Sequence, residues 1–291
     1  MSRLEAALRR AQSTTPATPA TPATAAPQPA TEQRIARAVA SLMTHAPIDE
    51  PRTPVAGIPE DGEVAEKLVV RNELDQSTVE QYRKLAATLH HAQTEKHLNV
   101  VMVSSAVPGD GKTLTSTNLA LTLSESYHRR VLLIDADLRK PSVHEVFQVK
   151  NRAGLTEALS ADTERRLPVV HASPYLSLLL AGRPDSDPMS GLTSARMRKL
   201  ISEAAAAFDW VIIDTPPVVM LPDANLLAAM VDAAILVVGA GKTPHKLITR
   251  AIDALGRGRI LGVVLNRVER SSLAGGYGYG YGYGSARYGV K

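Results

Sequence analysis

The residues between Leu98 and Thr115 have the types and spacing of a phosphate-binding site. A short run rich in β-branched residues, Leu98–Val103, predicts a strand buried on both faces. It leads into Ala106–Thr113, which reads Ala-x-x-Gly-x-Gly-Lys-Thr, and then into a helix with apolar residues through Leu119 and Leu123. The order strand, glycine loop, Lys-Thr, helix distinguishes a phosphate loop from a chance match to the pattern.

Each residue type in this loop has a defined task in binding a nucleotide. Gly109 and Gly111 let the backbone turn its N–H groups toward phosphate oxygens, and the helix N-terminus adds partial positive charge. Lys112 supplies a point charge for the β and γ phosphates, and Thr113 supplies a hydroxyl for Mg²⁺. The predicted nucleotide-binding residues are Pro108, Gly109, Asp110, Gly111, Lys112, Thr113 and Leu114.

Three aspartates follow two further apolar runs. Asp135 and Asp137 come after Val131–Ile134, and Asp214 comes after Trp210–Ile213. Mg²⁺ bound to phosphates prefers one or two carboxylates, so Thr113, Asp135 and Asp214 are the predicted metal ligands. Asp137 points to the same side as Asp135 and is a candidate proton acceptor. The alternative is that such aspartates only cap loops or helices.

Asn266 ends the last predicted strand, in Gly-Val-Val-Leu-Asn-Arg. Its side-chain amide has the donor and acceptor needed to pair with an adenine edge. Asparagine is equally natural in a turn, so the sequence leaves both interpretations open.

The elements that position these residues alternate between strands and helices. Further strands are predicted over Tyr175–Leu180, Ala233–Val238 and Ile260–Leu265, and helices over Ser194–Ala207 and around Leu247–Leu255. A capping-box pattern, Ser77 to Glu80, predicts the start of another helix before the first strand. The pattern predicts an α/β fold, with a parallel central sheet, helices on both faces, and the ligand at the carboxyl ends of the strands.

Composition limits the class of protein. The 291 residues have a net charge of +4, with basic residues scattered along the chain, which does not favour a nucleic-acid partner. The absence of cysteine excludes a disulfide scaffold and fits a reducing compartment. The N-terminus lacks the apolar core of a signal peptide, and the most apolar run, Leu226–Ala240, is too short to span a bilayer. We therefore expect a soluble intracellular protein.

Three regions are predicted: a leader and linker over residues 1–63, a P-loop domain over 64–270, and a tail over 271–291. Amphipathic stretches at 2–12 and 32–43 flank a Pro/Ala/Thr-rich stretch at 17–30, which predicts a semi-extended, disordered linker. The first stretch is either a docking element for a partner or a solubilising leader.

The tail alternates glycine with tyrosine and holds five of the eight tyrosines, namely Tyr277, Tyr279, Tyr281, Tyr283 and Tyr288. Glycine at alternate positions predicts a flexible segment. It is either a sticky low-complexity segment or a set of phosphorylatable hydroxyls. Fully extended from Ser271, it spans roughly 65–75 Å, which is enough to reach a neighbouring subunit.

Taken together, the loop, the Asp-x-Asp-x-Arg and Asp-Thr-Pro-Pro strand ends and the tyrosine tail resemble the bacterial tyrosine kinases of exopolysaccharide and capsule synthesis. The resemblance covers about residues 64–291, and residues 1–12 resemble the leader helix of exosortase-linked members. It implies a P-loop fold of the MinD/ParA-like kind, with Walker A at Ala106–Thr113, Walker A′ at Val131–Arg139 and Walker B at Val211–Pro217.

The resemblance also implies an activity. ATP and Mg²⁺ would be used to phosphorylate the tail tyrosines, chiefly between subunits, with Lys112, Asp135 and Asp137 as catalytic residues and Asn266 as a base contact. A membrane-embedded chain-length determinant (a polysaccharide co-polymerase) would be the activator and a protein-tyrosine phosphatase the counterpart. The chain would then be cytoplasmic and held at the inner face of the membrane by its partner.

Two departures and two alternatives accompany the resemblance. The family's oligomerisation pattern Glu-x-x-Arg-x-x-Arg is Glu80, Arg83 and Ala86 here, and no membrane-spanning segment is fused to the domain. A positioning ATPase of the MinD/ParA type shares the fold, but would have lysine where this chain has Val107. A nucleotide-binding scaffold without catalysis, acting on a polysaccharide machinery, is the other alternative.

Overall fold

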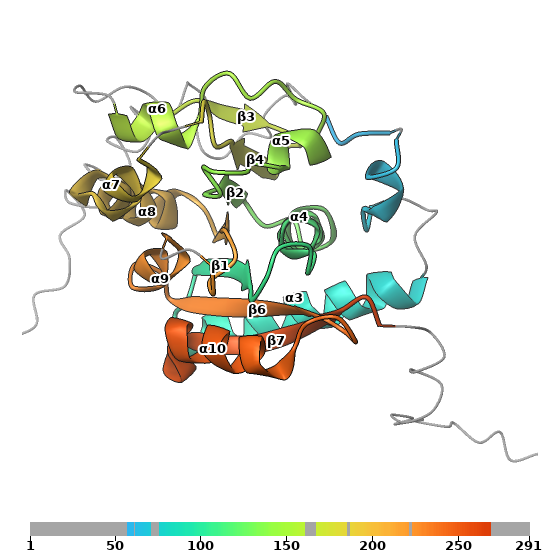
Figure 1. The fold of residues 1–291 in the computed structure, drawn as a ribbon. Helices are drawn as coiled ribbons and strands as arrows, with labels where there is room; N and C mark the ends of the chain where they lie inside the picture. The colour runs from blue at the N-terminus through green and yellow to red at the C-terminus, as the bar shows by residue number, and fades with distance from the viewer. Residues whose placement is uncertain are drawn as a thin grey trace, which may run out of the picture. The chain divides into compact units, whose positions relative to one another are not determined.

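The computed structural model describes residues 57–60, 62–70, 76–160, 167–184, 187–220 and 223–268. In this part of the chain a seven-stranded sheet has the order β3-β4-β2-β5-β1-β6-β7 (Figure 1). The strands are β1 (Val100–Ser105), β2 (Val131–Asp135), β3 (Val169–His171), β4 (Leu176–Leu179), β5 (Trp210–Asp214), β6 (Ala233–Gly239) and β7 (Ile260–Asn266).

The inner strands are parallel and buried along their whole length. Every residue of β1, β2, β5 and β6 is buried, as expected for continuous apolar runs covered by helices on both faces. β5 lies between β1 and β2, and its last residue Asp214 is in register with Asp135 of β2 and Val103 of β1. This register brings the carboxyl ends of the three strands together, so the phosphate loop and the aspartates meet at one edge.

Helices cover both faces of the sheet, in agreement with the predicted fold class (Figure 1). The helices are α3 (Gln76–Lys96), α4 (Lys112–Leu121), α5 (Val143–Val146), α6 (Leu155–Ser160), α7 (Pro188–Thr193), α8 (Ala195–Ala207), α9 (Asp223–Ala228) and α10 (His245–Leu255), with short 3₁₀ turns at Ala65–Lys67 and Arg257–Arg259 and a π-helical turn at Thr122–Ser126. One core contains residues of α3, α4 and α5, and the other contains residues of α6 to α10.

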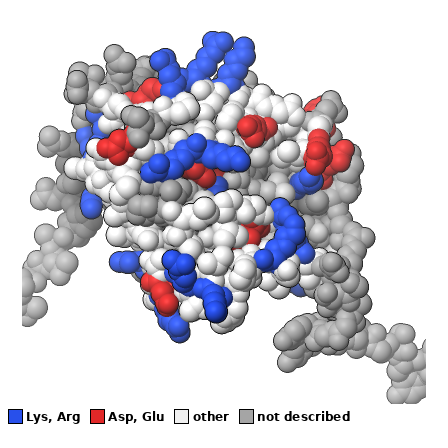
Figure 2. Space-filling model, viewed as in Figure 1, with Lys and Arg blue, Asp and Glu red and all other residues white. Residues whose placement is uncertain are grey.

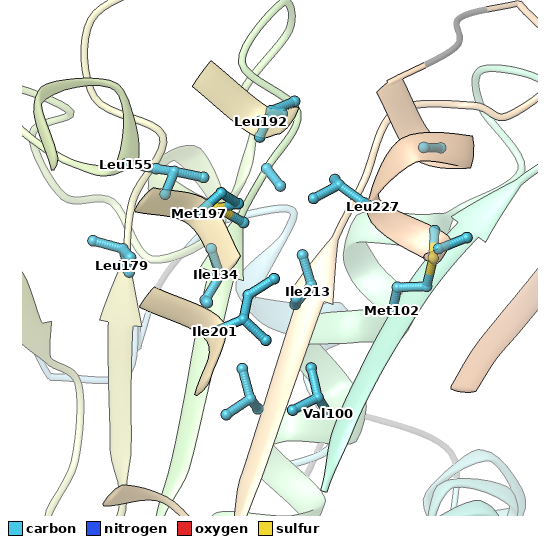
Figure 3. Close-up of a cluster of buried hydrophobic side chains, with 14 of the residues drawn as sticks. Val100, Met102, Ile134, Leu155, Leu179, Leu192, Met197, Ile201, Ile213 and Leu227 are labelled. Carbon is cyan, nitrogen blue, oxygen red and sulfur yellow. The ribbon is translucent and has the colours of Figure 1, made fainter. Parts of the chain in front are cut away.

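The second of these cores rests on α8. Ser194 caps the helix by accepting a hydrogen bond from the Met197 backbone N–H, and the helix then presents Met197, Leu200, Ile201 and Ala204 to the sheet. Met197 and Ile201 lie over Ile134 and Ile213 of the two strands that carry the aspartates (Figure 3). Packing of α8 therefore fixes the strand ends on which the site is built.

The segment before the sheet is attached to α4. The Asn118 side chain accepts from the Val69 N–H and donates to the Lys67 carbonyl. On the same side, α3 buries Ala86 completely, while Glu80 and Arg83 pair with each other at 2.5 Å. The third position of the Glu-x-x-Arg-x-x-Arg pattern thus faces the core in this chain, where an arginine would lose its hydration.

Several predicted details are wrong. Strand β1 begins at Val100, two residues later than the predicted run, and it ends with Ser104 and Ser105, whose hydroxyls donate to the Pro216 and Val107 carbonyls. The capping box at Ser77 is not a helix start, since α3 already includes Gln76. The short edge strand β3 was not predicted, and it runs antiparallel to β4. Three residues carry too little pattern to reveal a strand.

The sheet is also not covered completely at its other edge. In β7, Val263 and Leu265 expose 54% and 58% of their surface. They are two residues apart, so they lie on the same face of this edge strand. The predicted leader and linker lie outside the described residues up to residue 56, and so does the tail with its five tyrosines.

The packing of α8 predicts a large effect of shortening its central side chain. Met197→Ala removes a fully buried side chain and should lower the free energy of unfolding by about 2–5 kcal/mol. Met220→Ala, at a methionine that is 63% exposed, is the matched control and should change it by less than about 0.5 kcal/mol. Urea unfolding measures both, and equal effects of the two substitutions would contradict the packing described here.

Candidate active site

The phosphate loop adopts a conformation that its glycines permit. Gly109 and Gly111 have φ values of +84° and +95°, in the left-handed region that other residues rarely adopt. Gly111 is the N-cap of α4, so the helix begins at Lys112 and its first N–H groups face the loop. Ala106, where the pattern usually has glycine, is fully buried. The loop therefore keeps the geometry of an anion site despite this substitution.

Lys112 lies between two of the predicted carboxylates. Its Nζ is 2.9 Å from Asp137 Oδ2 and 3.6 Å from Asp214 Oδ2, and its side chain is only 12% exposed. Burial alone would lower the pKa of Lys112, but the charges of Asp214, Asp137 and Asp135 outweigh it and raise the pKa. The lysine is therefore a fixed positive charge at the carboxyl edge of the sheet.

Thr113 connects the loop to the strand-end aspartates. Its hydroxyl donates to Asp214 Oδ2 at 2.6 Å and lies 3.0 Å from the Ser142 hydroxyl. Because the single Thr113 hydrogen is used by Asp214, Ser142 is the donor in the second bond. Ser142 was not predicted from the sequence, since its position seven residues after Asp135 fits no spacing rule that we used.

The two other aspartates combine a structural and an electrostatic role. Asp135 Oδ2 accepts from the backbone N–H groups of Ser142 and Val143, each at 3.0 Å, at the start of α5. Asp137 Oδ1 accepts from the Lys140 N–H at 3.1 Å. Asp135 Oδ1 also accepts from the Asp137 N–H at 3.2 Å. As the capping interpretation predicts, backbone N–H groups bond both oxygens of Asp135 and one oxygen of Asp137, while the second oxygen of Asp137 contacts Lys112. Asp214 differs, since its Oδ1 is buried with no partner among the described residues.

Burial disfavours the ionised forms of Asp135 and Asp214. Burial, followed by the charge of Asp214, raises the pKa of Asp135 to about 7. Burial also raises the pKa of Asp214, with the neighbouring Asp137 charge acting in the same direction and Lys112 and Thr113 opposing it. A cation bound beside these two carboxyl groups would favour their ionised forms, so the site is suited to a metal ion.

The residues present fit Mg²⁺ with phosphate ligands. All the candidate donors are hard oxygens, the Thr113 hydroxyl and the carboxylates of Asp214 and Asp135, and the free Asp214 Oδ1 is an unused ligand. The described residues contain no group of three or more His, Cys, Asp or Glu side chains arranged to hold a metal by themselves.

Lys112 and the N-terminus of α4 place positive charge at the loop itself. On the face seen in Figure 2, lysine and arginine side chains are interspersed with aspartate and glutamate. The described helices include none that is both long and apolar enough to cross a membrane.

Asn266 lies beside the phosphate loop, at the end of β7. Its Nδ2 donates to the Asp110 carbonyl at 2.8 Å, and its Oδ1 accepts from the Arg267 N–H at 2.8 Å. An amide has capacity for one more bond at each atom, so a contact with an adenine stays a prediction. The Asp110 carboxylate accepts from Thr243 at 2.6 Å, another residue that the sequence patterns did not indicate.

The raised pKa values predict how stability depends on pH. The protonated form of Asp135 is favoured by folding, so its contribution to stability is fully present below its ordinary pKa of 3.8 and is lost as the pH rises through about 7. In magnesium-free buffer the free energy of unfolding should therefore fall between pH 3.8 and about 7 and change little above that range. Asp214→Asn removes the neighbouring charge and should reduce that fall. Urea unfolding at several pH values measures it, and identical pH dependence of both proteins would contradict the electrostatics.

A family profile of P-loop proteins and individual tyrosine-protein kinases are both similar to this chain. The ParA family profile, described as NUBPL iron-transfer P-loop NTPase, matches residues 96–270. Tyrosine-protein kinase YwqD of Bacillus subtilis is 37% identical over 190 residues, which is 64% of this chain and 80% of YwqD. Tyrosine-protein kinase etk of Escherichia coli K12 is 36% identical over 214 residues, 72% of this chain but 29% of that protein.

The similarity extends to three dimensions. The solved kinase domain of Escherichia coli tyrosine kinase ETK superimposes with a TM-score of 0.64 at 32% identity, covering 79% of this chain and 88% of that domain. The P-loop NTPase fold supports nucleotide and Mg²⁺ binding in general. The chain therefore belongs to the bacterial tyrosine-protein kinases, within the ParA-like P-loop NTPases.

Proposed function

We propose that this chain is an ATP-dependent protein-tyrosine autokinase. Its substrates are the tail tyrosines Tyr277, Tyr279, Tyr281, Tyr283 and Tyr288, phosphorylated mainly between subunits, and the reaction regulates synthesis and export of an exopolysaccharide or capsule. The observation that carries the proposal is Lys112 held between Asp137 and Asp214 at the start of α4, with Thr113 bonded to Asp214.

Binding of ATP would change the partners of Lys112. In the structure Lys112 is 2.9 Å from Asp137, a distance typical of a charge-assisted hydrogen bond. The β and γ phosphates carry more negative charge than one carboxylate, so the ammonium would move toward them. Asp137 would then lose its cationic partner, and its Oδ2 would be available to accept a proton.

The transfer itself needs few protein groups. The tyrosine oxygen would form the new bond to the γ phosphorus, the bond to the bridging oxygen would break, and ADP would leave, while the phenolic proton passes to Asp137. Thr113, Asp214 and Asp135 would hold Mg²⁺, which would neutralise charge on the phosphates. Lys112 and the loop N–H groups orient the γ phosphate and stabilise charge that moves toward the ADP oxygen.

Partner and location follow from the family and are also proposals. We propose that the chain is cytoplasmic, that a membrane-embedded chain-length determinant activates it at the inner face of the membrane, and that a protein-tyrosine phosphatase reverses the reaction. Self-association would proceed through the tail. The relatives that support this assignment include the putative tyrosine-protein kinases EpsB and CapB.

The kinase assignment makes a direct prediction for Lys112. Lys112→Met should abolish phosphotyrosine formation on incubation with ATP and Mg²⁺, because the substitution removes the charge that orients and neutralises the transferring group. Lys246→Met, at an exposed lysine of α10, is the matched control and should keep wild-type labelling. Detection uses an anti-phosphotyrosine blot and mass spectrometry of the tail.

The same experiment separates the alternatives. Undiminished labelling in Lys112→Met would show that another site carries the activity. ATP hydrolysis without phosphotyrosine in the wild type would favour a positioning ATPase of the MinD/ParA type, and nucleotide binding without either reaction would favour a scaffold.

A deletion tests the proposed docking role of the leader. Removing residues 2–12 should leave autophosphorylation of the purified protein intact, because the loop and the aspartates lie elsewhere in the chain. The same deletion should reduce recovery of the protein with sedimented membranes from cells. Unchanged membrane recovery would return the leader to a solubilising role.

A further inference from the structure

A carboxylate lies inside the loop that is expected to bind an anion. Asp110 sits between Gly109 and Gly111, and only 3% of it is exposed. A negative charge facing bound phosphates would oppose their binding. The position of this side chain, and the groups that hold it, therefore bear directly on the function of the loop.

The carboxylate is held on the side of the loop opposite to Lys112. The loop follows β1, and the sheet order places β5 and β2 on one side of β1 and β6 and β7 on the other. Lys112 reaches Asp214 and Asp137 on the first side. Asp110 is bonded on the second side, to Thr243 after β6.

The contacts on that side are close and specific. Thr243 donates its hydroxyl to Asp110 Oδ1 at 2.6 Å and accepts from the Gly239 N–H at 3.3 Å. Gly239 leaves room for the carboxylate, since a Cβ there would lie 2.9 Å from Asp110 Oδ1. The other oxygen, Oδ2, is buried with no partner among the described residues. The Thr243 bond is thus the one hydrogen bond that this part of the structure gives the carboxylate.

A second contact holds the backbone of the same residue. Asn266 Nδ2 donates to the Asp110 carbonyl at 2.8 Å. Gly111 makes this approach possible, because a Cβ at that position would lie 2.0 Å from Asn266 Nδ2. Both the side chain and the main chain of Asp110 are therefore fixed by residues that end or follow the last two strands.

We propose that Thr243 and Asn266 are positioning residues that hold the phosphate loop through Asp110. Thr243 keeps the carboxylate turned away from the phosphate side, and Asn266 fixes the peptide that precedes Gly111. The loop is then formed before a nucleotide arrives, so binding does not have to order it. The inference rests on the nucleotide-binding part of the proposed function and not on its kinase part.

Loss of the Thr243 hydroxyl should weaken binding of any triphosphate. Thr243→Val leaves a buried carboxylate without a hydrogen bond, so the loop should shift to hydrate it and the dissociation constant should rise about tenfold. Thr243→Ser keeps the hydroxyl and should restore binding, and Thr243→Ala repeats the test without the bulk of valine. Thr249→Val is the matched control, since the Thr249 hydroxyl bonds only to its own helix at the His245 carbonyl.

The experiment measures equilibrium dissociation constants of ATP, GTP and inorganic triphosphate with Mg²⁺ for the full-length chain. These binding measurements do not require phosphotyrosine formation. A protein that binds ATP but does not phosphorylate its tail would refute the kinase proposal, while the positioning roles of Thr243 and Asn266 could still be tested by the same measurements. For Thr243→Val and Asn266→Ala we expect similar losses with all three probes. A loss for Asn266→Ala confined to ATP would show a base contact and overturn its positioning role.

A double-mutant cycle shows whether Thr243 acts through Asp110. In an Asp110→Ala background, Thr243→Val should change the dissociation constants much less than it does in the wild type, because the bond to Asp110 is already gone and only the bond from the Gly239 N–H is left to lose. Additive effects of the two substitutions, or wild-type binding by both Thr243→Val and Thr243→Ala, would overturn the proposal.

Discussion

The site depends on one buried cation among carboxylates that could not be held together without it. Asp135, Asp137 and Asp214 are nearly or fully buried, and like charges at such depth repel strongly. Lys112 offsets this repulsion through Asp137 at 2.9 Å and Asp214 at 3.6 Å. It enters from α4, whose own N-terminus faces the loop, so the lysine that serves the phosphates also stabilises the empty site.

That arrangement requires the strand order of the sheet. The loop follows β1, the aspartates follow β2 and β5, and these three strands are neighbours although β1, β2 and β5 are far apart in the chain. Their ends are fixed because side chains of α8 on one face and α4 on the other pack over fully buried strands. A rigid sheet thereby holds Asp137 and Asp214 within 4 Å of the Lys112 ammonium, and Asp214 also within hydrogen-bonding distance of Thr113, at the start of α4.

Site residues that belong to a local sequence motif could be predicted. Site residues that only the tertiary structure places next to the phosphate loop could not. Gly109, Lys112 and Asp214 were predicted because a phosphate loop and a strand-end aspartate have local signatures. Ser142 and Thr243 were missed because a lone hydroxyl in a loop has no signature, and only the fold brings it to Thr113 or Asp110. The edge strand β3 was missed for a similar reason, since its pairing with β4 and not its own pattern makes it a strand.

The ion pair between Lys112 and Asp137 gives the proposed mechanism its sharpest test. Single-turnover transfer from ATP to the tail and the ATP dissociation constant should be measured for Asp137→Asn and for the wild type. If Asp137 accepts the phenolic proton after Lys112 moves to the phosphates, the transfer rate should fall by about 10²–10⁴-fold, while ATP binds as tightly as before or more tightly. A parallel loss of rate and of ATP affinity would contradict this role and assign Asp137 to metal or nucleotide binding.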